Sequence, residues 1–249
     1  MPRQARKKSE SKIYHVMLRG INQQQIFEDT EDCERFLDIL KECKEVCGYD
    51  IYAYCLMGNH VHLLIKEGTE PLELIFKRIC GKFAYWYNIK YRRIGHLFQD
   101  RFKSEPVDTT DYLMTVVRYI HQNPVKAGIC KRVSDYEYSS YCEYIGTSYI
   151  VDTAYILEIW GMDAFVELNE TTVKDNCLDV SEKPVVRVTD EQARALILKI
   201  AKCKSVAEFQ SLDITKRDKY LKKLREKGVS IRQLSRLTGV SIGVIRKAN

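Results

Sequence analysis

The chain has 249 residues, of which 45% are hydrophobic and 30% are charged, with a formal net charge of +6. These values are typical of a globular protein and exclude a disordered or collagen-like chain. There is no run of 18 apolar residues and no apolar segment behind the basic N-terminus, so we predict neither a membrane span nor a secretory signal.

The charges are unevenly distributed along the chain. From Lys77 to Lys103 there are eight Lys or Arg against one acid, and from Lys216 to Asn249 there are eleven against two. Between them, from Asp135 to Glu191, thirteen acids stand against three bases. Two basic blocks separated by an acidic one indicate two anion-binding surfaces, although solvated helix faces would give the same pattern. Nine cysteines without a Cys-x-x-Cys pair are typical of free thiols in a reducing cytosol.

The first half of the chain alternates between strand and helix patterns. Residues 1–12 form a basic arm, and a loop from Arg19 to Asn22 follows the first strand. Asp29 or Thr30 can cap the first helix and Gly48 can end it, with Phe36, Leu37, Leu40 and Val46 facing inward. The predicted elements are a strand at Ile13–Leu18, a helix to about Cys47, two strands around Gly58-Asn59, a helix from Pro71 to about Tyr91 and a strand at Leu97–Val107. This order predicts an α+β fold of the ferredoxin-like type, with an antiparallel sheet and both helices on one face.

His60 and His62 lie two residues apart in the second of the central strands. Alternate residues of a strand face the same side, so both rings point together while Val61 points into the opposite, apolar side. Two neutral imidazoles side by side can begin a divalent-metal site. Two surface histidines on an amphipathic strand are the simpler alternative.

A third helix begins near Thr109 or Asp111, and we expect it to end shortly before Pro124. Leu113, Val116, Val117 and Ile120 form its buried stripe. Tyr112, Tyr119 and Asn123 fall on an adjacent stripe, where half-buried packing is the ordinary role of a tyrosine. Residues 134–165 are rich in tyrosine and are expected to pack on this domain.

The last part of the chain has a separate pattern. Residues 166–188 are acidic and poorly periodic and are interpreted as a linker before a helical domain at 189–249. Apolar residues precede and follow Gly239 with the spacing of a helix-turn-helix, whose second helix would start at Ser241. A plain helical bundle is the alternative. Basic residues at both helices are expected to contact duplex DNA: Arg232, Arg236, Arg246 and Lys247.

Several stretches in family order over residues 12–145 resemble the single-tyrosine HUH transposases, in their REP-associated, IS200-like branch. These stretches are Tyr14-His-Val-Met-Leu-Arg-Gly-Ile-Asn22, Met57-Gly-Asn-His-Val-His-Leu-Leu64, His96-Leu-Phe-Gln-Asp-Arg-Phe102, Tyr119-Ile-His-Gln-Asn-Pro-Val-Lys-Ala-Gly128 and Asp135-Tyr-Glu-Tyr-Ser-Ser-Tyr141. The resemblance implies a metal site at His60, His62 and Asn123, with Gln122 as a less favoured ligand, and a nucleophile at Tyr119. The C-terminal part resembles, more loosely, the DNA-binding domain of replication initiators.

This resemblance implies DNA cleavage and rejoining, as in transposition and recombination, through a 5′-phosphotyrosine intermediate. Mg²⁺ or Mn²⁺ is the implied cofactor, although the ligand types would also admit Zn²⁺; no nucleotide is required. The expected partners are single-stranded or hairpin DNA at residues 13–165, duplex DNA at 189–249 and a second copy of the chain, in the bacterial cytoplasm at the nucleoid. Further contacts with DNA are expected from polar residues of the first loop and the first basic block: Arg19, Asn22, Lys82, Arg92, Arg93 and Arg101.

Aromatic residues among these bases, Tyr85, Trp86, Tyr87 and Tyr91, can stack on bases, or can simply pack in the core. Two other functions fit the same residues. One is a DNA-binding regulator that does not cleave, and the other is a hydrolase that uses metal-bound water. A covalent protein–DNA adduct distinguishes the transposase from both.

Overall fold

The computed structural model describes residues 6–171, 177–178, 188, 190–203 and 205–248. The chain divides into two compact units, Met1–Glu182 and Lys183–Asn249, and each has its own hydrophobic core. We describe each unit by itself. Much of the predicted acidic linker at 166–188 lies outside the described residues, as do the first five residues of the predicted basic arm.

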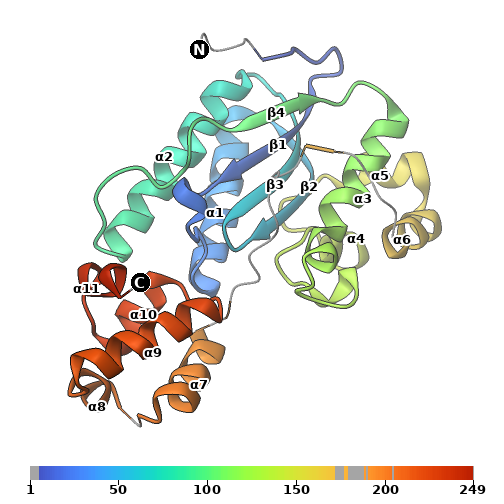
Figure 1. The fold of residues 1–249 in the computed structure, drawn as a ribbon. Coiled ribbons are helices and arrows are strands. Elements are labelled where there is room, and N and C mark those ends of the chain that lie inside the picture. The colour runs from blue at the N-terminus through green and yellow to red at the C-terminus, as the bar shows by residue number, and fades with distance from the viewer. Residues whose placement is uncertain (1–5, 172–176, 179–187, 189, 204, 249) are drawn as a thin grey trace. The chain divides into compact units, whose positions relative to one another are not determined.

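The first unit is built on a four-stranded antiparallel sheet with the order β2-β3-β1-β4 (Figure 1). Its strands and first two α-helices, in chain order, are β1 (Ile13–Arg19), α1 (Thr30–Cys47), β2 (Asp50–Met57), β3 (His60–Lys66), α2 (Leu72–Lys90) and β4 (Lys103–Pro106). A short 3₁₀ helix, η1 (Ile21–Gln23), follows β1. Both the element order and the strand order are those of the predicted ferredoxin-like fold, so the α+β prediction is confirmed.

Local sequence signals set the ends of α1 and the β2–β3 hairpin. Asp29 is the N-cap of α1 and forms a reciprocal capping box with Asp32. Gly48 ends the helix in the left-handed conformation at φ 63°, which a glycine adopts without strain. β2 and β3 meet at Gly58-Asn59, so the predicted turn is confirmed.

The fourth strand is much shorter than the predicted Leu97–Val107. Leu97 is buried, and Phe98 makes only an isolated bridge to Gly20. Asp100 then adopts a left-handed φ of 49°, which interrupts an extended strand, and regular pairing begins at Lys103. The prediction that Val46 faces inward was also wrong, because its side chain is 64% exposed on α1.

The third helix, α3 (Thr110–Lys126), covers the face of the sheet opposite α1 and α2 (Figure 1). Thr109 caps it as predicted, but the helix does not end before Pro124. Pro124 lies in the last turn, where its missing N–H removes a single backbone hydrogen bond, so the helix can continue to Lys126. Residues 121–123 are therefore helical and buried.

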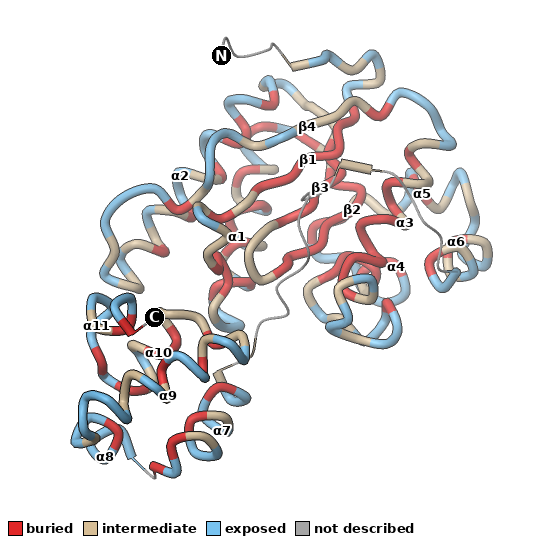
Figure 2. The backbone as a smooth tube through the Cα atoms, viewed as in Figure 1, coloured by how far each residue is buried: buried red, intermediate tan, exposed pale blue. Residues whose placement is uncertain are grey.

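The tyrosine-rich segment packs on this unit as short helices, with a 3₁₀ turn before them. They are η2 (Val133–Asp135), α4 (Tyr141–Ile145), α5 (Thr153–Trp160) and α6 (Met162–Glu170). Because Phe165 and Asn169 of α6 are buried, residues 166–170 are part of the first unit and the predicted linker began too early. Figure 2 shows that the buried residues gather along the strands and the facing sides of the helices.

The second unit contains five helices: α7 (Asp190–Ala201), α8 (Val206–Gln210), α9 (Ile214–Glu226), α10 (Ile231–Thr238) and α11 (Ile242–Lys247). Gly239 stands between α10 and α11 at φ 68°, and Ser241 caps α11, as the sequence predicted. A side chain at Gly239 would collide with the Gln210 amide, so a glycine allows the turn to pass close to α8. In the described part of the chain, no helix is both long and apolar enough to cross a membrane.

Candidate active site

The histidine pair lies at the start of β3, where the turn at Gly58-Asn59 opens the strand. The rings of His60 and His62 are 5.1 Å apart between centroids and nearly perpendicular, and Val61 is fully buried on the opposite side. The predicted alternation of the strand is confirmed. The Asn59 side-chain oxygen lies 2.7 Å from Nδ1 of His60.

A third histidine, which the sequence did not single out, completes a buried row on the same face. Nε2 of His15 on β1 lies 3.0 Å from Nδ1 of His62, and its Nδ1 lies 2.8 Å from Oε1 of Glu105 on β4. His15 stands directly opposite Glu105 in the antiparallel register, and both imidazoles of the His15–His62 contact are fully buried. The register of the sheet therefore aligns polar side chains from three strands in one row.

Tyr119 projects from α3 onto this row. Its ring lies 5.6 Å from His62 and 5.8 Å from His15 between centroids, in edge-on contact with both. The residue is 3% exposed, and its hydroxyl oxygen is buried. The ammonium of Lys126, two turns later on the helix, lies 4.8 Å from the ring centroid. A phosphodiester can reach the hydroxyl only after a local rearrangement.

Asn123 and Gln122 have different surroundings at the end of α3. Nδ2 of Asn123 donates to the backbone oxygen of Tyr119 at 3.0 Å, so the amide oxygen of Asn123 is the remaining ligand atom of that side chain. Nε2 of Gln122 instead donates to the backbone oxygens of Asn169 and Thr171, at the end of α6. Oε1 of Gln122 is likewise left without a hydrogen-bond partner among the described residues. The Gln122 side chain is anchored at the end of α6, whereas that of Asn123 is anchored on Tyr119, which favours Asn123 as the candidate ligand.

His62 has the properties of a metal ligand. Its Nε2 atom is buried and has no hydrogen-bond partner among the described residues. Burial, then the nearby His60 and His15 rings, hold the pKa of His62 well below its ordinary value, so the ring is neutral. Within the described residues, no group of three His, Cys, Asp or Glu side chains could hold a metal ion. Imidazole nitrogens and an amide oxygen are nevertheless ligand types that a divalent ion accepts.

The residues predicted to contact single-stranded DNA are spread over several surfaces. Arg19, at the end of β1, stands directly opposite His60 in the register and so lies beside the histidine pair. Arg93 holds the loop after α2 through Asn88 and the backbone of His96. Nζ of Lys82 forms an ion pair with Glu42 of α1 at 2.8 Å, on the helices that cover the other face of the sheet. Three further candidates are exposed: Asn22, Arg92 and Arg101.

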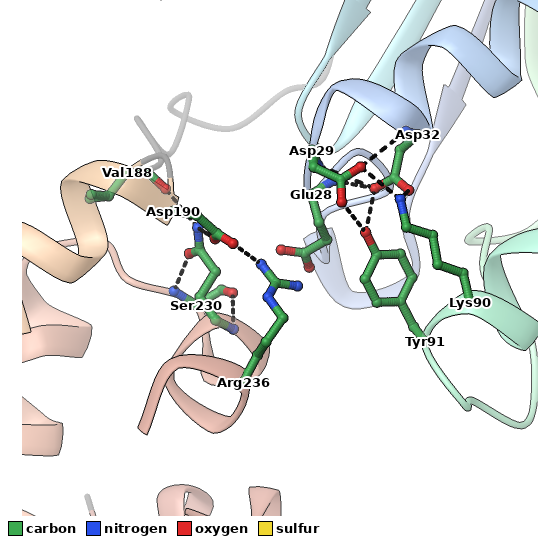
Figure 3. Close-up of polar contacts among 10 residues, drawn as sticks. Glu28, Asp29, Asp32, Lys90, Tyr91, Val188, Asp190, Ser230 and Arg236 are labelled. Carbon is green, nitrogen blue, oxygen red and sulfur yellow. Dashed lines mark hydrogen bonds and ion pairs between the residues drawn. The ribbon is translucent and has the colours of Figure 1, made fainter. Parts of the chain in front are cut away.

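The aromatic residues of α2 are divided between core and surface. Tyr87 is fully buried and Trp86 packs against the core, while Tyr85 is 72% exposed. Tyr91 donates its hydroxyl to Asp32 at 2.8 Å, beside Lys90 (Figure 3). Tyr87 and Tyr91 are therefore structural, and a role in base stacking is left to Tyr85 and Trp86.

In the second unit, the four predicted contacts with duplex DNA are not equivalent. Arg236 is held by an ion pair with Asp190 of α7, at 2.5 Å (Figure 3). Arg232 is half-buried, and Arg246 and Lys247 are exposed near the end of α11. The ion pair ties α10 to α7, so Arg236 has a structural role whether or not it also meets a phosphate.

Comparison with known proteins identifies the domain that carries the histidine row. Residues 8–123 match the family model described as "Transposase IS200 like". Over these residues the chain is similar to the IS200-like transposases. The match spans β1 to α3 and contains His15, His60, His62, Tyr119 and Asn123.

The relatives of this region carry a more specific description. The chain is 29% identical over 124 residues to a "Putative REP-associated tyrosine transposase" of Haemophilus influenzae, which covers 45% of this chain and 70% of that protein. It is 27% identical over 95 residues to the "REP-associated tyrosine transposase" of Escherichia coli K12, over 37% of this chain and 54% of that protein. These homologues confirm the predicted branch of the family.

A solved structure of a REP-associated tyrosine transposase bound to a REP hairpin has the same fold. It aligns with a TM-score of 0.54 and 18% sequence identity, over 73% of this chain and 100% of that chain. At that identity the likeness establishes the architecture of the transposase domain alone.

Proposed function

We propose that the first unit cleaves and rejoins single-stranded or hairpin DNA, with Tyr119 as the nucleophile. The observation that carries this proposal is the contact of the Tyr119 ring with both His62 and His15. The contact lies on the face of the sheet that carries the histidine pair. A lone buried tyrosine would be ordinary packing, but here it adjoins a neutral buried imidazole with an available nitrogen. The REP hairpin held by the related structure makes hairpin DNA the substrate to test.

The chemistry is an in-line displacement at phosphorus. Oη of Tyr119 attacks the phosphorus atom, the new Tyr–O–P bond forms and the bond to the 3′ oxygen breaks. The phenolic proton passes to solvent, and the departing 3′ oxygen takes up a proton to leave as a 3′ hydroxyl. Attack by that hydroxyl, or by one from another strand, reverses the step, so rejoining requires no nucleotide.

His60, His62 and Asn123 would hold a divalent ion, Mg²⁺ or Mn²⁺, beside the nucleophile. Such an ion supplies charge neutralisation at the phosphate and stabilises the departing oxygen. The protein contributes by fixing where these three ligands lie. β3 fixes both imidazoles on one side of the strand, and the Asn123–Tyr119 hydrogen bond ties the third ligand to the turn of α3 that carries the nucleophile. Arg19 stands next to His60 in the sheet, where it can contact a phosphate.

The second unit is proposed to bind duplex DNA through α10 and α11. Its support is the turn at Gly239 and the exposed Arg246 and Lys247. The two units would then recognise a hairpin and its flanking duplex separately. The same chain could function as a homodimer, which the oligomeric state in solution would decide.

The decisive experiment is to trap the covalent intermediate. Incubation with a single-stranded hairpin oligonucleotide and Mn²⁺ should give an adduct that survives SDS, and Tyr119→Phe should abolish it. Tyr112→Phe tests the other tyrosine on this side of α3, which lies two turns earlier and bonds to Glu105 rather than meeting His62. An adduct that persists in Tyr119→Phe but is lost in Tyr112→Phe would identify the other tyrosine as the nucleophile.

Two other outcomes correspond to the alternative functions. Cleaved DNA without any adduct would indicate hydrolysis by metal-bound water. Hairpin binding with neither cleavage nor an adduct would indicate a DNA-binding regulator.

A further inference from the structure

A row of three side chains leads from the edge of the sheet to the candidate metal ligand His62. Glu105 on β4, His15 on β1 and His62 on β3 are joined by contacts of 2.8 Å and 3.0 Å. The residues are separated by 90 and 47 positions in the chain, and both imidazoles are fully buried. Of the three side chains, only that of Glu105 is partly exposed to solvent, at 26%.

The outer end of the row fixes the direction of its hydrogen bonds. Oε1 of Glu105 also accepts the backbone N–H of Leu178 at 2.9 Å. Burial alone would raise the pKa of Glu105, but hydrogen bonds from His15, Leu178 and Tyr112 outweigh burial and leave that pKa lowered. An ionised carboxylate only accepts hydrogen bonds, so Nδ1 of His15 must carry the proton that it shares with Glu105.

The position of the proton on His15 determines its position on the inner imidazole, His62. When Nδ1 carries the one proton of the His15 ring, Nε2 is bare and can only accept. Nδ1 of His62 must therefore donate across the 3.0 Å contact. An imidazole binds a metal ion in its neutral form, so the single proton of such a His62 ring is on Nδ1 and Nε2 keeps its lone pair. Nε2 is also the buried atom of His62 that has no hydrogen-bond partner among the described residues.

We propose that Glu105 and His15 are positioning residues that hold His62 in the tautomer whose Nε2 lone pair can bind a divalent ion. This inference rests on the metal site of the proposed function. His15 and Glu105 touch neither DNA nor the ion, and they act by orienting His62, as a carboxylate commonly orients a metal-bound histidine. The row extends that arrangement by one imidazole.

The variants separate tautomer control from simple packing. His15→Phe keeps a ring of similar size and removes the acceptor for His62, and Glu105→Leu removes the carboxylate at the less buried end. Glu105→Gln is the conservative variant. The Leu178 N–H can only donate to its amide oxygen, so that oxygen takes the place of Oε1 and can still accept from His15. Val16→Ala is the matched control, because Val16 is buried on β1 next to His15 but faces the other side of the sheet.

Two measurements that do not depend on catalysis test the inference on the full chain. Nitrogen-15 NMR of histidine side chains in the metal-free protein should show His62 with its proton on Nδ1, and His15→Phe should lose this single tautomer. Calorimetric titration with Mn²⁺ should show binding weakened about 10- to 100-fold in His15→Phe and Glu105→Leu. Glu105→Gln and Val16→Ala should stay near the wild-type affinity, and circular dichroism should confirm that each variant is folded.

The inference is overturned if wild-type His62 carries its proton on Nε2. It is equally overturned if folded Glu105→Leu binds Mn²⁺ as tightly as the wild type, or if Val16→Ala weakens binding as much as His15→Phe. Failure of the metal site in the proposed function gives a different result, since the wild-type chain would then bind no Mn²⁺. The tautomer measured without metal would still decide whether the row directs the proton.

Discussion

Replacing Lys90 with Met should destabilise the first unit far more than replacing Lys82 with Met, although both lysines lie on α2 and both form ion pairs with α1. Nζ of Lys90 bonds to Asp29, Glu31 and Asp32 at 2.7 to 2.9 Å. Figure 3 shows its contacts with Asp29 and Asp32. Within the described part of the chain, Lys82 forms an ion pair with Glu42 alone. The two residues are eight positions apart and make a matched pair.

The expected loss in the free energy of unfolding follows from how deeply each ion pair is buried. The Asp32 side chain is fully buried and also accepts the backbone N–H of Glu28, whereas the side chains of Lys82 and Glu42 are 48% and 42% exposed. Removing one partner of a buried ion pair costs about 3–5 kcal/mol. Because the Lys90 side chain is itself 19% exposed, we expect the lower end of that range. An exposed pair such as Lys82–Glu42 contributes at most about 1 kcal/mol.

Protonation of Asp32 limits the loss. Burial raises the pKa of Asp32 even with its hydrogen bond to Lys90, so without the lysine the carboxyl group would take up a proton more readily. The Tyr91 hydroxyl, which donates to the same carboxylate, would remain. Lys90→Met should therefore leave a folded but weakened protein rather than an unfolded one.

Urea denaturation followed by circular dichroism measures both variants, and a hairpin gel-shift assay measures their DNA affinity. Lys90→Met should lower the free energy of unfolding by at least three times as much as Lys82→Met, with little change in hairpin affinity. If the two variants are equally stable, the reasoning from burial is wrong. If Lys90→Met loses hairpin binding at unchanged stability, Lys90 is a phosphate contact and not a structural residue.

Three further predictions concern the site and the two units. His60→Ala or His62→Ala should abolish hairpin cleavage but largely spare hairpin affinity, because phosphate contacts dominate binding; a lost circular dichroism signal would instead mark the pair as structural. Asn169→Ala should lower the free energy of unfolding by about 1–3 kcal/mol, because it removes the partner of the buried His121 Nδ1; an unchanged thermal melt would contradict this. A fragment of residues 183–249 should bind duplex DNA with an affinity that falls as salt rises, and joining it to residues 1–182 should tighten binding to a hairpin flanked by duplex through effective concentration. No duplex binding by the fragment, at either of two salt concentrations, would mean that α10 and α11 are structural.

The parts of the fold that sequence predicted well depend on local signals. The caps at Asp29 and Gly48, the turn at Gly58-Asn59 and the cap at Ser241 each require only a few neighbouring residues to be read correctly. The order of strands and helices followed from them. The end of α3 was misjudged because a proline in the last turn of a helix removes only one hydrogen bond, and the sequence pattern treats it as a stop.

The site was only half visible in the sequence. His60 and His62 share a strand, and Tyr119 and Asn123 share a helix, so periodicity alone pairs them. His15 lies in a strand with largely apolar neighbours, and its partners come from two other strands whose register no local pattern specifies. Its alternation with Met17 and Arg19 was a usable signal, because those positions would share a face once a sheet had formed.

The row of side chains across three strands also has a consequence for the timing of activity during synthesis. A chain that has emerged from the ribosome only as far as β3 contains both His60 and His62, but β4 and α3, with Glu105 and Tyr119, have not yet been made. Contacts across 47 and 90 residues close slowly compared with those within a hairpin or a helix, so the sheet must be complete before the row exists. A nascent or partly folded chain therefore lacks the proposed active site. The proposed cleavage of DNA would become possible only with the last strand and the helix after it, as a property of the finished domain.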